Sequence, residues 1–412
     1  MSFQSGLSGL NAAAKNIDII GNNVANANTV GFKNSRAIFA DVYANSLAGT
    51  GASNVGIGVR VAQVQQEFTQ GNVTVTNSPL DIAINGTGFF RFDTAGSPAY
   101  SRNGQMHLDS TGYVVNSDNL RLTGYTVDAS NNIVSSSAVP LRLATSDINP
   151  LATSSLAATL NLDSRSTPIT APFSMSNAAT YTSSTSTAIY DSLGNSHALT
   201  MFFTKTATAG QWNLQASLDG GAVTNVDLGA GAGNPVPLTF DSSGLLTTAQ
   251  PIPGISLTIA NGAVTPQTVA INFTGTTQFG AEFGASALSQ NGYTSGRLVG
   301  FDIADNGMIQ GRYTNGQANT LGQIVLANFS NPQGLRSMGD NRWEETSASG
   351  SPVMGTPQTA SLGSLQAAAV EDSNVDLTQE LVNMITAQRV YQANAQTIKT
   401  QDQVLQTIVN LK

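Results

Sequence analysis

Two histidines, His107 and His197, are the side chains in this cysteine-free sequence best suited to acid–base or metal chemistry. A zinc site or a Ser-His-Asp triad needs several partner side chains, and neither histidine has Cys, His or Glu at ligand spacing. His197 follows Asp191, Ser192 and Ser196, but these residues fit a hairpin turn better than a triad. We therefore expect neither catalytic nor metal-binding residues.

Short glycine and aspartate motifs do not change this expectation. Gly86-Thr87-Gly88 and Gly56-Ile57-Gly58 lack the strand-glycine-helix context of a dinucleotide site. Asp305-Asn306-Gly307 resembles a fragment of a calcium loop, but no Glu follows at the spacing of the twelve-residue loop. The sequence thus predicts no cofactor-binding residues, no cofactor and no enzyme.

The strongest pattern lies in the segment from Asp376 to Lys412, which contains neither Gly nor Pro. Residues recurring every third then fourth position predict a helix with a heptad seam. Asp376 and Gln379 have the spacing of an N-cap and its reciprocal partner. The seam comprises Leu377, Leu381, Met384, Gln388, Tyr391, Ala395, Ile398, Asp402, Leu405 and Val409. We expect the polar members, Gln388 and Asp402, to face a neighbour or a hydrated channel.

The first segment, 1–26, repeats this pattern. Its stripe comprises Phe3, Leu7, Leu10, Ala14, Ile17, Gly21 and Val24. Gly6, Gly9 and Gly21 weaken it as an isolated helix. Taken alone, such a segment also fits a helix docked on a globular domain. A matching helix at the opposite end favours two helices that pair with each other and with neighbouring subunits, and that fold on assembly.

Composition excludes several classes of partner. The 412 residues suffice for about three domains. Charged residues make up 10% of the chain, with a net charge of −8, whereas about 25% is usual. Lysines and arginines are scattered, so we expect no nucleic-acid partner. Neither a Sec-type signal nor a stretch near the roughly 20 apolar residues of a membrane span is present. We therefore expect no membrane insertion and another export route.

Between the two ends, alternation with a period of two predicts short β-hairpins. Segment 148–287 is rich in Ser, Thr, Ala and Gly and predicts an inserted all-β domain. Hairpin signals return after it, at Asp305-Asn306-Gly307 and Asn315-Gly316. We expect this returning part to complete the sheet that begins before residue 148. The turn signals before the insertion are Asn103-Gly104, Asp109-Ser110-Thr111-Gly112, Asp118-Asn119 and Asn131-Asn132.

Several short sequence motifs resemble those of the bacterial flagellar axial proteins, meaning the rod, hook and hook-junction subunits. Asn22-Asn23-Val24-Ala25-Asn26-Ala27-Asn28-Thr29, followed by Gly31-Phe32-Lys33, resembles the N-terminal signature of that family. Met384-Ile385-Thr386-Ala387-Gln388-Arg389-Val390-Tyr391 closes the family pattern. The stretch Ile189 to His197 resembles the outer domain of hook proteins, which the shorter rod proteins lack. The resemblance therefore favours a hook protein over a rod protein.

The resemblance also has consequences for export and assembly. It implies that the termini form a coiled-coil domain lining a tubular polymer, and that subunits leave the cell unfolded through the flagellar type III export apparatus. The element from Phe39 to Tyr43 resembles the Phe-x-x-x-hydrophobe motif presented to the export gate, with Phe39 and Tyr43 as recognition residues. The alternative is an ordinary i, i+4 apolar pair on a short helix.

The expected fold is mainly β with helical termini, in an elongated multi-domain subunit. An antiparallel coiled coil of the N- and C-terminal helices carries two all-β domains, the outer one inserted into the inner one. The expected parts are a terminal coiled-coil domain (1–30 and 374–412), a linker and export-signal region (31–75 and 358–373), a middle β domain (76–147 and 288–357) and an outer β domain (148–287).

The function implied is that of a structural subunit of the flagellar hook, extracellular and associated with the basal body. It would self-assemble into a short curved helical tube and act as a flexible universal joint transmitting torque from rod to filament. The implied partners are further copies, the flagellar rod and hook-filament junction proteins, the hook cap and the export apparatus. The alternatives are a distal rod-type axial protein and a secreted β-rich adhesin. The expected assembly interface comprises Phe3, Leu7, Leu10, Ile17, Val24, Leu377, Leu381, Met384, Tyr391, Ile398 and Leu405.

Overall fold

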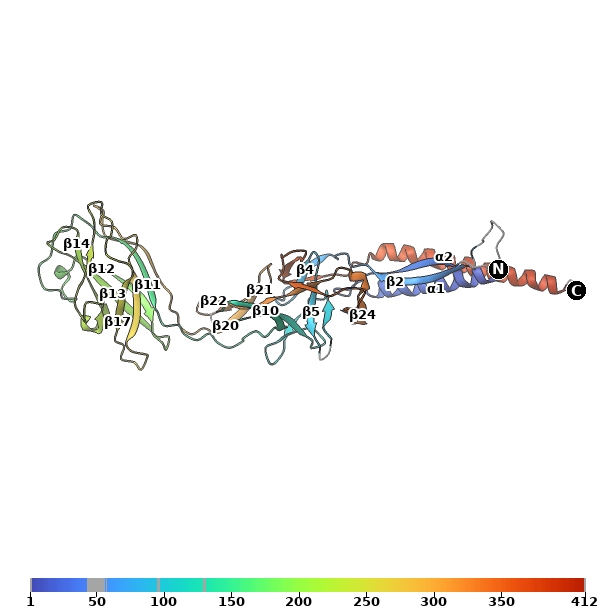
Figure 1. Cartoon of the computed structure of the whole chain (residues 1–412), viewed down its shortest axis with the longest axis horizontal. Helices are drawn as coiled ribbons and strands as arrows, with labels where there is room; N and C mark the ends of the chain where they lie inside the picture. Colours follow the sequence, from blue (N-terminus) through green and yellow to red (C-terminus); the bar gives the residue numbers. More distant parts are fainter. Residues whose placement is uncertain (1, 43–55, 57, 95–96, 129–130, 411–412) are drawn as a thin grey trace. The chain divides into compact units, whose positions relative to one another are not determined.

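The computed structural model describes residues 2–42, 56, 58–94, 97–128 and 131–410. The chain forms two compact units (Figure 1). The first comprises residues 1–145, 300–312 and 318–412, and the second comprises residues 146–299 and 313–317. The second unit is therefore an insertion in the first. It contains the segment 148–287 and extends beyond it at both ends.

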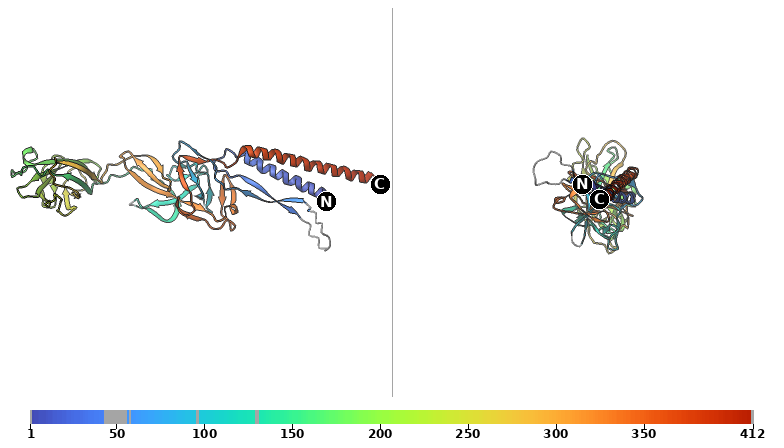
Figure 2. Two further views of the ribbon diagram at one scale, coloured as in Figure 1. Left: turned by 90° about the horizontal axis from the view of Figure 1, so that it is seen from above. Right: turned by 90° about the vertical axis from the view of Figure 1, so that its right-hand side faces the viewer.

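The helices of the first unit come from the two ends of the chain. They are α1 (Ser2–Ala25) and α2 (Leu377–Asn410). They run antiparallel, because Gly6 of α1 lies beside Ile398 of α2 while the other end of α1 lies near the start of α2 (Figure 2). With 34 residues against 24, α2 extends beyond the first residues of α1. The expected fold, mainly β with paired terminal helices, is confirmed.

A β-hairpin follows α1 and packs against it. Its strands are β1 (Ser35–Val42) and β2 (Gly58–Gln66), paired antiparallel with Ser35 opposite Gln66. This hairpin lies in the segment for which the sequence predicts a linker, so the described part of that segment has regular structure. The polar and apolar residues of β2 alternate only in part, since Val59, Val61 and Val64 are separated by two and then three positions. The bulge between Ile38 and Phe39 accommodates this irregular spacing.

The body of the first unit is a large antiparallel sheet with the central path β20-β21-β22-β9-β5-β6-β25-β24. Strands β22, β23 and β25, which follow the insertion, pair with β9, β5 and β6, which precede it. The expectation that the returning chain completes the first sheet is thereby confirmed. The strands are β5 (Phe89–Asp93), β6 (Ala99–Ser101), β7 (His107–Leu108), β8 (Val114–Val115), β9 (Arg121–Val127), β10 (Ile133–Pro140), β20 (Leu298–Ile303), β21 (Met308–Tyr313), β22 (Ala318–Ile324), β23 (Leu326–Asn328), β24 (Arg336–Gly339), β25 (Arg342–Glu344) and β26 (Val353–Gly355).

Two small strand pairs connect this body to the helices. Strand β27 pairs with β4, and β28 pairs with β3, both antiparallel. These strands are β3 (Val73–Val75), β4 (Ile82–Asn85), β27 (Ser364–Ala367) and β28 (Ala369–Glu371). An aromatic cluster lies beside them, where Phe89 and Trp343 pack edge to face at 5.8 Å between ring centroids. Each pair joins a segment that precedes the insertion to one just before α2.

Predicted turns occur where chain direction reverses. Gly112 lies between β7 and β8 with φ of 86°, and Gly316 lies between β21 and β22 with φ of 78°. These left-handed values favour glycine, because a β-carbon would be strained there. The turn motifs of the sequence therefore mark true strand ends.

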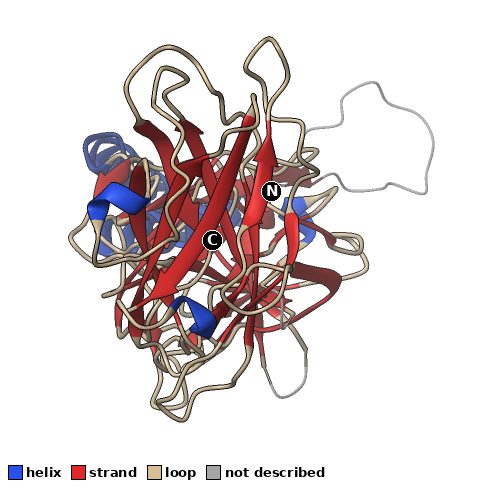
Figure 3. Cartoon of the chain, turned by 90° about the vertical axis from the view of Figure 1, so that its left-hand side faces the viewer, coloured by secondary structure: helices blue, strands red, loops and turns tan. Residues whose placement is uncertain are grey.

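The second unit is a sandwich of two sheets. Their strand orders are β15-β17-β18-β11-β19 and β12-β13-β14-β16. Buried side chains of both sheets form one core, with Phe203 and Trp212 facing Ile255 and Ile271. Strands dominate the regular structure (Figure 3). The strands are β11 (Ser155–Asn161), β12 (Ser183–Tyr190), β13 (Ser196–Lys205), β14 (Gln211–Leu218), β15 (Val226–Asp227), β16 (Val236–Thr239), β17 (Ile252–Leu257), β18 (Gln267–Asn272) and β19 (Gly284–Gln290).

Candidate assembly interface

The start of α2 is fixed by Asp376. Its Oδ1 accepts hydrogen bonds from the backbone N–H of Thr378 (2.9 Å) and Gln379 (3.1 Å). The predicted N-cap is confirmed. The reciprocal half of the prediction is wrong, because Gln379 Nε2 donates to Asn383 Oδ1 (3.1 Å) along the helix instead of returning to the cap.

Small residues let α1 and α2 approach closely. A β-carbon at Gly9 would lie 2.8 Å from Asn394 Oδ1, and one at Gly6 would lie 3.2 Å from Ile398 Cγ1. Ala13, further along the same face of α1, is buried. Residues three and four apart share a helix face, so these positions form a flat stripe on α1. Gly6 and Gly9, which weaken an isolated helix, thus permit this contact.

The contact between the two helices coincides in part with the predicted heptad seam. On α2, Ala387, Asn394 and Ile398 lie toward α1, and Ile398 belongs to the predicted seam. The seam rests on apolar spacing, whereas the contact also uses Gly, Ala and Asn residues, which carry little hydrophobic signal. Asp402 accepts a hydrogen bond from Gln406 Nε2 (3.0 Å) in an exposed part of α2, so it is neither dry nor unpaired.

All eleven residues of the expected assembly interface are exposed or half-buried in the isolated chain. Phe3, Leu7, Leu377, Leu381, Tyr391 and Leu405 are between 37% and 54% exposed. The half-buried members are Leu10, Ile17, Val24, Met384 and Ile398. Large apolar side chains in a helix gain stability when they leave water, at roughly 25 cal/mol per Å². The helix pair therefore carries apolar surface that its own chain does not cover.

Exposed apolar side chains occur on more than one face of α2. At about 100° per residue, Tyr391 and Leu405 lie within about 20° of the contact residue Ile398, whereas Val382 and Ile385 lie on the opposite face. The hairpin packs against α1, where the backbone N–H of Val59 donates to Ser8 Oγ (3.2 Å).

An asparagine network holds the end of α1 against the hairpin and the start of α2. Asn23 Nδ2 donates to Asn34 Oδ1 and to the carbonyl oxygen of Ser35, both at 2.8 Å. Asn23 Oδ1 accepts from the backbone N–H of Ser35 (3.0 Å). Asn374 Oδ1 accepts from the backbone N–H of Asn34 (2.7 Å), and its Nδ2 donates to the carbonyl oxygen of Glu67 (2.8 Å). Strongly directional bonds thus fix the angle at which the helices leave the β body.

A buried ionic cluster anchors the same junction. Lys33 Nζ lies 2.6 Å from Glu371 Oε1, and Arg102 Nη1 lies 3.1 Å from Glu371 Oε2. All three side chains are almost fully buried. Lys33 Nζ also donates to the carbonyl oxygen of Thr69 (2.7 Å), and the backbone N–H of Gly71 donates to Glu371 Oε1 (2.9 Å). The cluster joins segments separated by 338 positions in the sequence.

Burial dominates the electrostatics of this cluster. Loss of hydration lowers the pKa of Lys33, and the nearby Arg102 charge lowers it further, whereas Glu371 raises it. Burial likewise lowers the pKa of Arg102 against the opposing effect of Glu371. Glu371 is the shared anion for both cations, and removal of such a partner is strongly destabilising. No local pattern in the sequence indicates this cluster, although Lys33 lies in the family motif Gly31-Phe32-Lys33.

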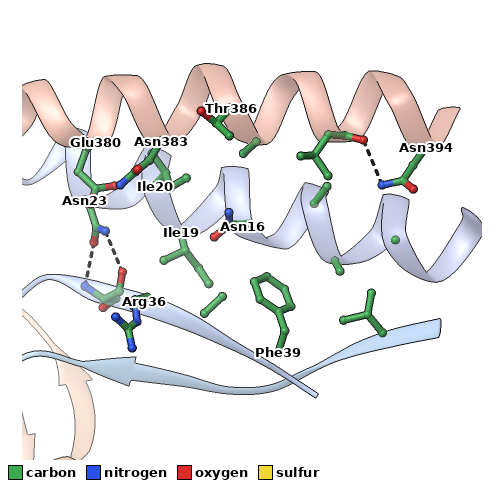
Figure 4. Close-up of a pocket in the computed structure, with 18 of the residues that line it drawn as sticks. Asn16, Ile19, Ile20, Asn23, Arg36, Phe39, Glu380, Asn383, Thr386 and Asn394 are labelled. Atoms are coloured by element: carbon green, nitrogen blue, oxygen red, sulfur yellow. Dashed lines mark hydrogen bonds between the residues drawn. The ribbon is translucent and has the colours of Figure 1, made fainter. Parts of the chain in front are cut away.

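A groove runs along the helix pair and the hairpin (Figure 4). It has a volume of about 970 Å³. Ile19 and Ile20 of α1, Val390 of α2 and Phe39 of β1 supply apolar side chains to its lining. Glu380 lies at the end nearest the start of α2. Because α1, the hairpin and α2 all line it, the groove forms only when the two ends of the chain meet.

The structure describes only one of the two residues, Phe39 and Tyr43, that we expect the export gate to recognise. Phe39 lies in β1 and is 42% exposed, so the alternative of a short helix is wrong for this residue. Its side chain lines the groove with Ala37 of the same strand. Tyr43 lies outside the described residues. The role of this motif in export stays a prediction.

The histidine considered for catalysis belongs to a turn network in the second unit. His197 Nε2 lies 3.2 Å from Asp191 Oδ2, and His197 Nδ1 lies 2.6 Å from Asp219 Oδ2. Asp191 is fully buried and accepts the backbone N–H groups of Leu193 (2.9 Å) and Asn195 (2.8 Å). These bonds define a capped turn between β12 and β13, as the sequence predicted. Ser192 Oγ accepts the backbone N–H of Val264 (2.9 Å), which ties the turn to a neighbouring loop.

No cluster of three or more His, Asp or Glu side chains suited to a metal occurs among the residues that the structure describes. In the same part of the chain, neither helix combines the length and hydrophobicity that crossing a bilayer requires. The described features are an inserted β sandwich and a terminal helix pair with uncovered apolar side chains. Together they define the class of a β-rich structural protein with paired terminal helices.

Comparison with known proteins identifies the family. The flagella basal body rod protein family matches residues 3–33, and the flagellar hook protein FlgE/F/G D1 domain matches residues 83–154. The flagellar basal body protein FlaE D2 domain matches residues 161–293, and the flagellar basal body rod FlgEFG protein C-terminal family matches residues 366–411. These four matches follow one another in chain order between residues 3 and 411, with the longer stretches 34–82 and 294–365 between them unmatched.

Full-length relatives indicate the same family. The chain is 42% identical over 421 residues to the flagellar hook protein FlgE of Escherichia coli (strain K12), covering all of both chains. It is 33% identical over 456 residues to that of Borreliella burgdorferi, covering 100% of this chain and 99% of the relative. The chain therefore belongs to the flagellar hook protein family. The prediction of a structural hook protein, acting in motility in the flagellum outside the cell, is confirmed.

A solved structure supports the fold. The chain is similar to a flagellar hook protein of Helicobacter pylori, with a TM-score of 0.52 and 13% sequence identity. The similarity covers 72% of this chain and all of the other. At this identity the comparison concerns the fold alone.

Proposed function

We propose that the protein forms a short curved helical tube that acts as a flexible universal joint between the flagellar rod and filament. Its family is a family of hook proteins, and hook subunits assemble with copies of themselves. The finer assignment concerns which part of the chain builds the tube and which part lets it bend. The terminal helices would form the inner wall, and the β units would form the outer layers.

The observation that carries this proposal is the uncovered apolar surface of the helix pair. Phe3 and Leu7 of α1 and Leu377, Leu381 and Tyr391 of α2 are exposed on that pair. Contact of these side chains with a different surface on the next copy would be heterologous. A heterologous contact that does not close on itself generates a helical polymer. Close-packed helices would transmit torque along the tube.

The end of α2 gives further support. It extends beyond α1 and carries the exposed side chains Val404 and Leu405. Within the described chain, no other element covers this end. An apolar helical end of this kind would be stabilised by a neighbouring subunit. The full proposed interface comprises Phe3, Leu7, Leu10, Ile17, Val24, Leu377, Leu381, Met384, Tyr391, Ile398 and Leu405.

The specific partners follow from this role. The tube would contact rod proteins at one end and hook-filament junction proteins at the other, with the hook cap present during growth. The export apparatus would recognise Phe39 and Tyr43 in the unfolded chain. The side chains of the terminal helices are suited to packing and not to catalysis, so the proposed role is structural and not enzymatic. No cofactor enters it.

Electron microscopy of the purified full-length chain tests the proposed function. We expect short curved tubes whose mass per length corresponds to many copies, formed at concentrations above a threshold. An adhesin would give monomers, and a rod-type protein would give straight tubes. A chain that stays monomeric under all assembly conditions would contradict the proposal.

A further inference from the structure

The groove on the helix pair contains a carboxylate oxygen without a partner. Glu380, in the first turn of α2, is only 7% exposed and lines the groove (Figure 4). Its Oε2 is buried and has no hydrogen-bond partner. The other charged residues of the groove, Arg36 and Glu67, lie 3.6 Å apart as an ion pair. Because a buried carboxylate oxygen without a donor is unfavourable, the groove is suited to receive a cationic side chain.

A ridge on α2 has the complementary chemistry. We define this ridge as Val382, Ile385 and Arg389, whose spacing of three and then four residues places them on one helix face. At about 100° per residue, this face points away from α1. Val382 and Ile385 are each 53% exposed, and Arg389 is exposed. No ion pair of Arg389 is found among the residues that the structure describes.

We propose that the ridge of one copy docks in the groove of the next copy, with the Arg389 guanidinium paired to the Glu380 carboxylate. This inference rests on the proposed function, because it names the two surfaces that meet in the polymer. Val382 and Ile385 would pack against the apolar lining that includes Ile19 and Phe39. In the described part of α2, the cations are Arg389 and Lys399. Only Arg389 belongs to the apolar ridge.

The contact joins two different surfaces and is therefore heterologous. Each copy offers one groove and one ridge, so every internal copy uses both and the contact propagates without closing. A guanidinium is well suited to this role, because it forms bidentate hydrogen bonds with a carboxylate and desolvates more readily than an ammonium group. The same pairing explains why a charged side chain is retained in a nearly dry groove.

Charge reversal in two separate chains tests this docking. In the Glu380→Arg variant, the groove and the ridge both carry a guanidinium, so its copies repel one another. In the Arg389→Glu variant, the groove and the ridge both carry a carboxylate, and its copies also repel. We expect each variant alone to need at least about tenfold more protein than wild type to form tubes. An equimolar mixture places opposite charges at every contact when the two variants alternate, so we expect it to assemble near the wild-type concentration.

Two controls make the result specific. Glu380→Arg mixed with Lys399→Glu should not recover assembly, because Lys399 lies off the ridge. Circular dichroism and amide exchange of each monomer show whether the helix pair remains folded, and Glu380→Gln provides a milder change at the same site. We expect Glu380→Gln to weaken assembly less than Glu380→Arg does.

The outcomes separate this inference from the proposed function. Recovery when Glu380→Arg is mixed with Arg389→Glu, without recovery when it is mixed with Lys399→Glu, supports the docking. Wild-type tubes with no recovery in the first mixture overturn the docking and leave the proposed function intact, because another surface would then occupy the groove. Normal assembly of Glu380→Arg alone also overturns it. If wild-type protein forms no tubes, the proposed function fails and the docking fails with it.

Discussion

In the inserted unit, Trp212 and Phe203 are completely buried between two sheets, whereas in the terminal helix pair Leu377 and Leu381 remain nearly half exposed. The sandwich buries its large apolar side chains within one chain. The helices use small residues for their mutual contact and leave large ones on the surface. From this difference we expect the inserted unit to be stable in isolation and the helices to gain stability from other copies.

The two regions also differ in how they use charge. In the inserted unit, Asp191, His197 and Asp219 bond to one another in a local turn. In the first unit, Lys33, Arg102 and Glu371 join distant segments at the base of the helices. A local network stabilises one hairpin, whereas a long-range network fixes the position of a whole element. The predictions below change one region and use the other as its reference.

The largest effect is expected for Glu371→Ala. The substitution leaves Lys33 and Arg102 buried without their anion, which destabilises the first unit by about 3–5 kcal/mol. Chemical denaturation of the monomer should show an earlier transition of the first unit and an unchanged transition of the inserted unit. The control is Glu67→Ala, because Glu67 pairs with the exposed Arg36 and should contribute at most about 1 kcal/mol. Equal losses in the two variants would contradict the proposed anchor.

Ile398→Asp is expected to stop assembly. Ile398 contacts the α1 surface at Gly6, and an unpaired charge in that packed contact costs several kcal/mol. The β regions should retain their circular dichroism signal, while sedimentation should detect no tubes. The matched control is Gln396→Asp, an exposed position one half-turn earlier, which should assemble. Tubes of normal length from Ile398→Asp would show that this helix contact is dispensable.

Two glycine substitutions in α1 should have opposite effects. Gly9→Ala places a β-carbon 2.8 Å from Asn394 Oδ1, so the Asn394 side chain must leave the contact, and we expect this loss to exceed the roughly 0.5–1 kcal/mol that alanine gains over glycine in a helix. Gly21→Ala meets no atom within 4 Å and should stabilise the helix by about 0.5–1 kcal/mol. Amide exchange in α1 should therefore quicken in the first variant and slow in the second. A change of the amide exchange rate in the same direction in both variants would contradict the close contact between α1 and α2.

The smallest effect concerns pH and the inserted unit. Burial lowers the pKa of His197, but hydrogen bonds and charge interactions with Asp219 and Asp191 raise it, and the net pKa lies above the ordinary value of 6.5. The stabilisation is complete below 6.5 and is lost as pH rises through the raised pKa. The melting temperature of the inserted unit should fall modestly across this window. His197→Gln should lack this change, and persistence of the change in that variant would assign it to another group.

The sequence predicted much of this molecule because the relevant signals were local. Turn motifs such as Asp109 to Gly112 and the N-cap at Asp376 act within a few residues, and the structure confirms them. The apolar stripes correctly predicted two terminal helices. Those stripes did not reveal the whole contact between the helices, since Gly6, Gly9 and Asn394 contribute to it beside Ile398.

Long-range features could not be predicted from local pattern. Glu371 and Lys33 meet although 338 positions separate them, and a single charged residue gives no sign of its partner. The hairpin β1–β2 was missed for another reason. The resemblance of the segment from Phe39 to Tyr43 to an export motif favoured a linker and export-signal region over 31–75. Unpartnered Glu380 became visible only once burial was known.

Amide hydrogen exchange of the full-length chain, compared between monomer and assembled tube, tests the central claim most directly. If the terminal helices depend on neighbouring copies, amides in α1 and α2 exchange quickly in the monomer and at least about tenfold more slowly in the tube. The inserted unit should exchange slowly in both states. Equal protection of α1 and α2 in monomer and tube would show that the chain ends need no neighbour, and it would contradict the account.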